Sequence, residues 1–310
     1  MRVPRAQLAR WQALPPTLRG ILWAALAGIL FSILNVLMRD VTLDVHPFVV
    51  CFWRYLFGTL ALLPVIMNSG VGVLRVAKPG NHLIRSLVHT GGLGLWFYAL
   101  PLIPIAETTA LGFTTPLFIT LGAIFLLQEQ VGLRRLVAVG IGFVGMLIIL
   151  RPGFAELSYG SILMLISAPL FAGSNLLAKL VARDDSITAI VTWQSLLISL
   201  FCLPAAILVW ELPSLTQFLW LILGGALGTA GHLALSQSYK VADITAVQPI
   251  GFLTLVWATL LGYAIFGDKP DLWTWIGAAV IFAANTYISH RELVRRGRAD
   301  LSGDTPPPAH

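Results

Sequence analysis

Amides and aromatic rings recur at helical spacing inside apolar stretches of this 310-residue sequence. Asn35 lies four residues after Phe31, and Asn175 lies four residues after Phe171, so each amide would share one helix face with a ring. An amide facing lipid costs free energy, and we therefore expect these side chains to face protein or a cavity. Such a pair could clamp an amphipathic ligand. Alternatively, each amide could hydrogen-bond a neighbouring helix.

Arg54 is a cation inside an otherwise apolar stretch, about seven residues from its start. An arginine at that depth must pair, extend to the membrane interface, or line a wet path. On a wet path it could attract an anionic group such as a carboxylate. The sequence leaves these three roles open.

Three further side chains could take up and release protons. His89 and His232 lie at similar depths in two apolar stretches, and histidine titrates near neutral pH. Glu107 begins another stretch, where the dipole of a helix N-terminus also favours an acid without any proton transfer. A structural hydrogen bond is the alternative role for each histidine.

Trp96, Tyr98 and Gln248 are additional candidates for lining a cavity, although aromatic side chains near the ends of spans are often interfacial anchors. The sequence contains no G-x-S-x-G, H-E-x-x-H or P-loop motif. Cys51 and Cys202 both lie in apolar stretches and lack the paired spacing of a metal site. We therefore expect neither an enzyme nor a bound cofactor or metal.

The composition indicates a membrane protein. Hydrophobic residues make up 57% of the chain and charged residues only 11%, whereas soluble proteins average about 25% charged residues. A spanning helix needs about 20 mostly apolar residues, and helices satisfy backbone polar groups internally. Ten such stretches predict an all-α polytopic membrane protein, at residues 20–38, 47–67, 83–103, 106–127, 133–150, 158–180, 186–210, 217–239, 244–266 and 271–290.

The cations alternate between the two sides of the predicted spans. Sixteen of the 20 Lys and Arg residues, Arg85 among them, fall on the side of the N-terminus, three fall on the other side, and Arg54 lies within a span. The positive-inside rule then predicts that both termini are cytoplasmic. A basic surface for nucleic acid would not produce this alternation.

The sequence repeats itself internally. Sliding it by 140 residues aligns 30–64 with 170–204, with 11 identities in 35 positions. The matches other than leucine include Phe31/Phe171, Asn35/Asn175, Trp53/Trp193 and Pro64/Pro204. Five spans in each repeat predict two halves of opposite orientation, an arrangement common in secondary transporters. The expected organisation is a cytoplasmic segment 1–19, repeats 20–150 and 158–290, and a disordered cytoplasmic tail 291–310.

Several motifs in this order resemble EamA-type permeases of the drug/metabolite transporter superfamily. They are His46-Pro47-Phe48, Phe52 to Gly58, Ala106-Glu107, Phe113 to Pro116, Gly142 to Gly145, Arg151-Pro152, Leu255 to Ala258 and Ile276 to Ala279. Asp268 departs from the pattern, since the family usually has glutamate there. The resemblance implies ten helices, a central cavity between the halves and no ATP hydrolysis.

The resemblance also predicts a function. Related carriers move amino acids, riboflavin, S-adenosylmethionine, nucleotide sugars or drugs. We therefore expect a secondary transporter that moves a small metabolite by alternating access, with a passive channel or a drug efflux permease as alternatives. The expected location is the bacterial inner (plasma) membrane, as a multi-pass monomer or homodimer. Its partners would be a small-molecule substrate and the bilayer, without nucleic acid.

Overall fold

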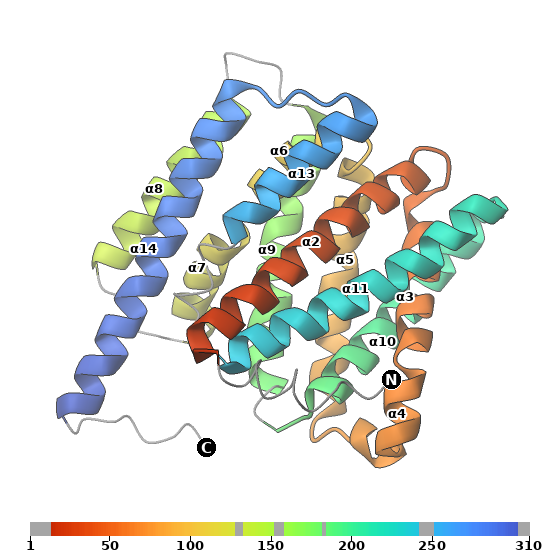
Figure 1. Ribbon diagram of the computed structural model, residues 1–310, viewed down its shortest axis with the longest axis horizontal. Coiled ribbons are helices and arrows are strands. Elements are labelled where there is room, and N and C mark those ends of the chain that lie inside the picture. Colours follow the sequence, from red (N-terminus) through yellow and green to blue (C-terminus); the bar gives the residue numbers. More distant parts are fainter. Residues whose placement is uncertain (1–13, 128–132, 152–157, 182–183, 242–250, 303–310) are drawn as a thin grey trace.

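The computed structural model describes residues 14–127, 133–151, 158–181, 184–241 and 251–302. Within these ranges the secondary structure is helical and contains no strand (Figure 1). The elements are α2 (Pro16–Thr42), α3 (Pro47–Ala61), α4 (Leu63–Ser69), η1 (Val71–Leu74), α5 (Pro79–Ala99), α6 (Ile105–Gly112), α7 (Thr115–Leu127), α8 (Leu133–Leu150), α9 (Tyr159–Val181), α10 (Ile187–Leu208), α11 (Leu215–Val241), α13 (Gly251–Phe266) and α14 (Leu272–Ser302).

Several of these helices meet the requirements of a membrane span. Five of the described segments are both long and apolar enough: Leu18–Thr42, Pro47–Ser69, Tyr159–Ala178, Ile187–Leu208 and Leu215–Leu235. Two shorter apolar segments, Leu136–Leu150 and Thr254–Phe266, fall below the length of a full span. The helical class predicted from the sequence is therefore confirmed, while length and composition identify fewer full spans than the ten predicted stretches.

One predicted span is not a single helix. The stretch 106–127 breaks between α6 and α7, at Phe113 and Thr114. Pro116 follows directly, and a proline removes a backbone donor and clashes with the preceding turn. The side-chain amide of Asn285 donates to the Phe113 carbonyl at 2.8 Å, which satisfies a backbone group freed by the break. The prediction of one continuous helix is wrong here.

The C-terminal helix is longer than expected. α14 continues to Ser302, so residues 291–302 are helical where the sequence predicted a disordered tail. The segment from Arg291 to Arg296 is rich in arginine, glutamate and leucine, which are good helix formers. These residue types therefore favour a continued helix in spite of their charge. Residues 303–310 lie outside the described part of the chain.

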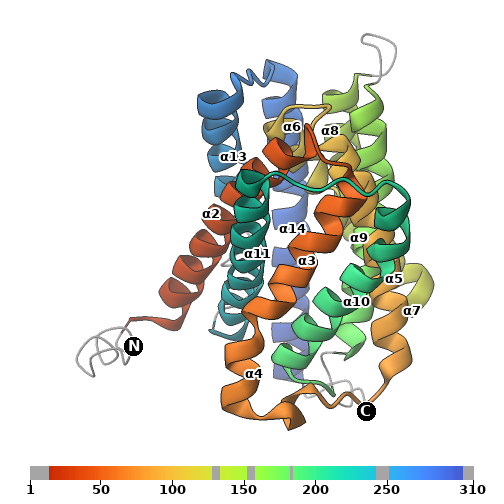
Figure 2. The ribbon, with the colours of Figure 1, turned by 90° about the vertical axis from the view of Figure 1, so that its right-hand side faces the viewer.

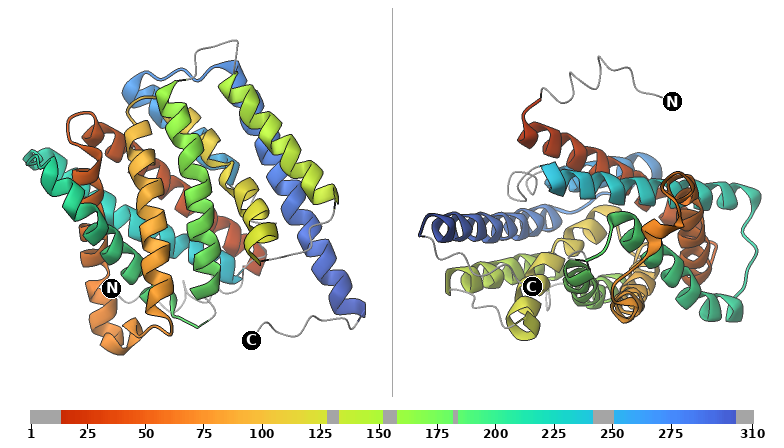
Figure 3. Two further views of the ribbon diagram at one scale, coloured as in Figure 1. Left: turned by 180° about the vertical axis from the view of Figure 1, so that it is seen from behind. Right: turned by 90° about the horizontal axis from the view of Figure 1, so that it is seen from below.

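Helices from the two parts of the chain alternate in space. α2 packs along α11, α5 along α9, α3 along α10, and α8 along α14. Figure 2 shows α3 lying between α11 and α10, and Figure 3 shows α8 and α14 together at one side of the bundle. Each of these pairs joins one helix that ends before residue 152 with one that starts after residue 157. Neither part could keep these apolar faces covered without the other.

The α8–α14 pair meets at two glycines. A Cβ built on Gly145 would lie 2.9 Å from the carbonyl oxygen of Gly277, closer than real Cβ contacts. Membrane helices use small residues in this way, because dispersion contacts between closely packed backbones replace the missing hydrophobic effect. The crossing point of α8 and α14 therefore requires glycine at position 145.

We expect Gly145→Val to destabilise the protein by about 1–3 kcal/mol, because overpacking forces the two backbones apart. The measurement is the thermal unfolding midpoint in detergent, which should fall. Gly140→Val is the matched control, since Gly140 lies on the same helix and a Cβ added there would meet no neighbouring atom within 4 Å. Equal midpoints for the two variants would contradict the assigned crossing point.

Candidate functional site

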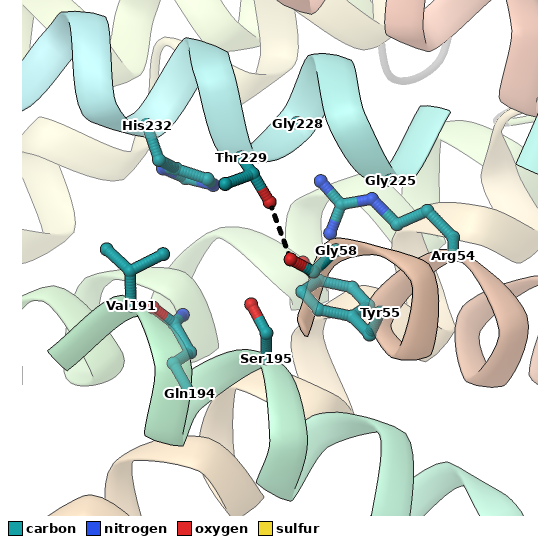
Figure 4. Close-up of a pocket in the computed structure, with 10 residues that line it drawn as sticks. All are labelled: Arg54, Tyr55, Gly58, Val191, Gln194, Ser195, Gly225, Gly228, Thr229 and His232. Atoms are coloured by element: carbon teal, nitrogen blue, oxygen red, sulfur yellow. Dashed lines mark hydrogen bonds between the residues drawn. The ribbon is translucent and has the colours of Figure 1, made fainter. Parts of the chain in front are cut away.

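A small polar cavity lies within the bundle between α3, α10 and α11 (Figure 4). The space open to the centre of a water-sized sphere is about 10 Å³, which is room for about one water molecule. The lining residues are Arg54, Tyr55, Gly58, Val191, Gln194, Ser195, Gly225, Gly228, Thr229 and His232. The cavity is thus too small for a metabolite in this conformation.

Arg54 places its charge in the cavity and not at the membrane interface. It is 6% exposed and starts about 10 Å along α3 by the rise per residue. Its guanidinium lies 3.9 Å above the centre of the Tyr55 ring, an arrangement that stabilises a cation by cation–π attraction. On the far side it approaches Gly228 of α11 so closely that a Cβ there would collide with it.

The α10 side of the cavity is set by helical spacing. Val191, Gln194 and Ser195 lie three and four residues apart, so they share one face. Arg85 of α5 donates through Nη2 to Gln194 Oε1 at 2.6 Å. By sequence Arg85 counts among the inner-side cations, but in the structure it is buried, with 7% exposure. The bond orients the Gln194 amide from behind the cavity wall.

The phenylalanines and histidines singled out by sequence contact each other. The rings of Phe31 and His232 meet edge-on with centroids 5.1 Å apart, and those of Phe171 and His89 meet edge-on at 5.0 Å. His89 Nδ1 also lies 3.0 Å from the Ser174 hydroxyl. Of these four predicted residues, His232 lines the cavity. A proton relay through the histidines stays a prediction.

The predicted asparagines lie outside the set of residues that line the cavity. Asn35 is half-buried, and Asn175 is exposed. Their phenylalanines point into the bundle, toward the histidines, so amide and ring do not form a common clamp around this cavity. Gln248, another predicted residue, lies outside the described part of the chain.

Three other predicted residues make contacts away from the cavity: Glu107, Trp96 and Tyr98. Glu107 accepts a hydrogen bond from the Ser161 hydroxyl at 2.6 Å, which joins α6 to α9. Trp96 packs against the two main apolar clusters of the bundle. The Tyr98 hydroxyl lies 2.5 Å from Nε2 of His46, the residue that precedes α3. None of the three lines the described cavity.

The sequence did not indicate several of the residues that line the cavity. Tyr55, Ser195 and Thr229 are common residue types in spans, and only the packing of three helices brings them together. Arg85 had a detectable signal, since His82, Arg85 and His89 recur at the spacing of one helix face. A polar stripe on an otherwise apolar helix indicates the side that faces protein.

Polar contacts tie the two parts of the chain together at the end of the bundle where η1 and the start of α10 lie. Asp185, between α9 and α10, lies 2.7 Å from His82 Nε2 and accepts the Ala77 backbone N–H at 2.8 Å. Burial alone would raise the pKa of Asp185, but the hydrogen bonds from His82 and Ala77 outweigh it and lower that pKa. The Asp185 side chain is buried, and it makes these contacts as a charged carboxylate.

The opposite end of the bundle has its own polar contacts. Arg39, at the end of α2, forms an ion pair with Asp268 in the loop between α13 and α14. Asp268 also accepts the backbone N–H of Ile105 at the start of α6, at 3.2 Å. The side-chain amide of Gln217 donates to Asp44 at 3.2 Å. Contacts between the two parts of the chain therefore lie at both ends of the bundle.

We expect acid to weaken the contacts that Asp185 makes with His82 and Ala77. Because the pKa of Asp185 is lowered from its ordinary value of 3.8, the stability that it contributes is present above that value and is lost as the pH falls through the lowered one. The wild-type thermal midpoint should fall below about pH 4, and Asp185→Asn should be less stable at pH 6 with a shallower acid loss. The neighbouring exposed Asp184→Asn is the control. An acid loss of equal slope in Asp185→Asn and wild type would contradict the assignment.

Comparison with known proteins supplies the context for this site. A family model described as the EamA-like transporter family matches residues 18–151 and again residues 158–289. A riboflavin transporter of Rhizobium johnstonii is 33% identical over 279 residues, covering 89% of this chain and 92% of its own. An S-adenosylmethionine uptake transporter of Rickettsia prowazekii is 29% identical over 280 residues, covering 90% and 95%.

The fold also has a counterpart among solved structures. One crystal structure matches with a TM-score of 0.59 at 23% sequence identity, over 88% of this chain and 96% of its own. At that identity the match shows a shared fold alone.

Proposed function

The chain belongs to the EamA-like transporter family, and we propose that it moves its substrate by alternating access around the cavity between α3, α10 and α11. It is a multi-pass protein of the bacterial inner membrane and a transporter of a small metabolite. Relatives are named for S-adenosylmethionine and for riboflavin, so these two compounds are the first substrates that we propose.

The observation that carries this proposal is a small polar cavity that lies between contacts at both ends of the bundle. A carrier must be able to close either side of its site, whereas a pore conducts through a path open to both. The described cavity has room for about one water molecule. The contacts of Asp185 at one end and Asp268 at the other join the two parts of the chain. This arrangement supports a carrier over a passive channel.

The pairing of helices supports the mechanism. Under the 140-residue repeat, α2 corresponds to α9 and α5 to α11, so the pairs α2–α11 and α9–α5 are equivalent. Two equivalent halves of opposite orientation can exchange conformations and thereby expose one site to either side in turn. We therefore propose that 20–150 and 158–290 are such halves, with both termini cytoplasmic.

The cavity wall also favours a metabolite over a hydrophobic drug. Sites for drug-sized ligands are mostly apolar with a few polar groups. Here six of the ten lining residues carry a polar side chain, Arg54, Tyr55, Gln194, Ser195, Thr229 and His232. A polar or amphipathic substrate would satisfy these groups, and a purely apolar one would leave them without partners.

Transport in proteoliposomes tests the proposed function. We expect saturable uptake of labelled S-adenosylmethionine or riboflavin that accelerates when the same unlabelled compound is loaded inside, since a carrier returns faster when occupied. Liposomes without protein are the control. Flux that rises linearly with concentration and ignores internal substrate would favour a channel instead.

Two buried thiols offer a test of alternating access. Cys202 of α10 donates through its thiol to Cys51 of α3, with the sulfur atoms 2.9 Å apart. Coupling them with copper–phenanthroline joins the two parts of the chain, as each thiol loses a proton and two copper(II) ions accept one electron each. We expect cross-linked protein to lose most of its uptake and dithiothreitol to restore it. Cys202→Ser should resist the oxidant. Full transport by protein whose disulfide is verified by mass spectrometry would argue against a separation of α3 and α10.

A further inference from the structure

Arg54 and Gln194 offer hydrogen-bond donors from opposite walls of the cavity, and Arg85 supports Gln194 from behind. On the basis of the proposed function, we infer that the substrate carries a carboxylate, which the Arg54 guanidinium and the Gln194 amide bind. Arg85 acts as a positioning residue for that amide. The inference names a chemical class of substrate for the site.

Two positive charges are buried here, and no acid in the described part of the chain forms an ion pair with either. Arg54 is 6% exposed and Arg85 is 7% exposed. Among the described residues, no carboxylate forms an ion pair with either of them, since the ion pairs found there involve Arg39, His82 and Arg151. A buried charge without a counterion is unfavourable, and intramembrane cations of this kind mark substrate pathways. An anion bound in the cavity would supply the missing charge.

The geometry of Arg54 suits a planar acceptor. One face of its guanidinium is covered by the Tyr55 ring, so the N–H groups in the guanidinium plane are the donors left for a ligand. Figure 4 shows this group directed from α3 toward Gly228 on α11, across the space between the two helices. Arginine donates two parallel N–H bonds to a carboxylate, a geometry that lysine does not reproduce.

Gln194 contributes a second donor because Arg85 uses its acceptor. The Oε1 atom of Gln194 takes the hydrogen bond from Arg85 Nη2 at 2.6 Å. An amide whose oxygen is engaged on one side presents its NH₂ group on the other, and the bond fixes this orientation. Nε and Nη1 of Arg85 are buried without a hydrogen-bond partner, so the bond to Gln194 is the one that holds its guanidinium.

Water alone is a poor substitute for an anion at this site. The cavity has room for about one water molecule, which would neutralise neither guanidinium. A complete substrate needs more space, so α3 and α11 must separate when the site opens. The closed form retains the donors and the charge that a carboxylate would meet first.

Matched ligand pairs test the inference on the purified, full-length protein. S-adenosylmethionine and decarboxylated S-adenosylmethionine differ by one carboxylate, and flavin mononucleotide differs from riboflavin by a phosphate. In calorimetric titrations we expect S-adenosylmethionine to bind at least about tenfold more tightly than its decarboxylated form, the effect of charge-assisted hydrogen bonds.

Substitutions identify the residues that produce the preference for the carboxylated ligand. Arg54→Gln should abolish the preference for the carboxylated ligand. Arg85→Gln should reduce the preference and Arg85→Lys should restore part of it, because a positioning role depends on holding the Gln194 amide. The exposed Arg75→Gln is a control for loss of positive charge and should bind as wild type does.

The outcomes separate this inference from the proposed function. Equal affinity for both members of the S-adenosylmethionine pair, or an unchanged preference in Arg54→Gln, overturns the carboxylate site while transport can persist. A preference for flavin mononucleotide over riboflavin with none in the other pair assigns the charge to phosphate and also overturns it. Wild-type protein that binds none of the four compounds overturns both the carboxylate site and the proposed substrates.

Discussion

Lipid offers no hydrogen bonds, so polar side chains in a spanning helix are most stable where they face another helix or a cavity. This constraint explains the orientation of α3, α5, α10 and α11. Arg54, Arg85 and Gln194 all turn inward and meet near one small cavity, while residues such as Leu200 and Ile207 of α10 are exposed on the outside. The bundle is therefore arranged around a polar centre, with apolar side chains on its surface.

Close packing then depends on helices from different parts of the chain. α3 lies between α10 and α11, and its backbone approaches α11 near Gly58 and Gly225. Because each of these contacts joins the two parts, a rearrangement of one part must change the walls of the cavity. The same helices that close the cavity are thus the ones whose separation would open it, which couples packing to transport.

Family membership indicates transport but does not by itself specify the substrate, since related proteins are named for S-adenosylmethionine and for riboflavin. These compounds differ in charge, so the charged residues near the cavity are the ones that could distinguish between them. Arg54 and Arg85 are buried without a carboxylate partner in the described ranges. Because of these two positive charges, the cavity differs from one surrounded by neutral polar groups alone.

Properties that depend on local composition could be predicted from the sequence. Apolar stretches and short connections predict membrane helices, because hydropathy is a property of each segment alone. The depth of Arg54 within such a stretch already indicated an unusual residue. The spacing of His82, Arg85 and His89 also carried information, since helical geometry places them on one face.

Tertiary structure decided which side chains meet. The ring of Phe171 contacts His89 from another helix, while Asn175 on the same helix is exposed. Arg85 supports Gln194 although 109 positions separate them in the sequence. The partners of a side chain depend on the rotation and crossing of helices that are distant along the chain, and no local pattern encodes these. The sequence alone therefore determined a helical membrane protein with an unusual buried arginine, and only the packing of α3, α5, α10 and α11 made that arginine part of a site.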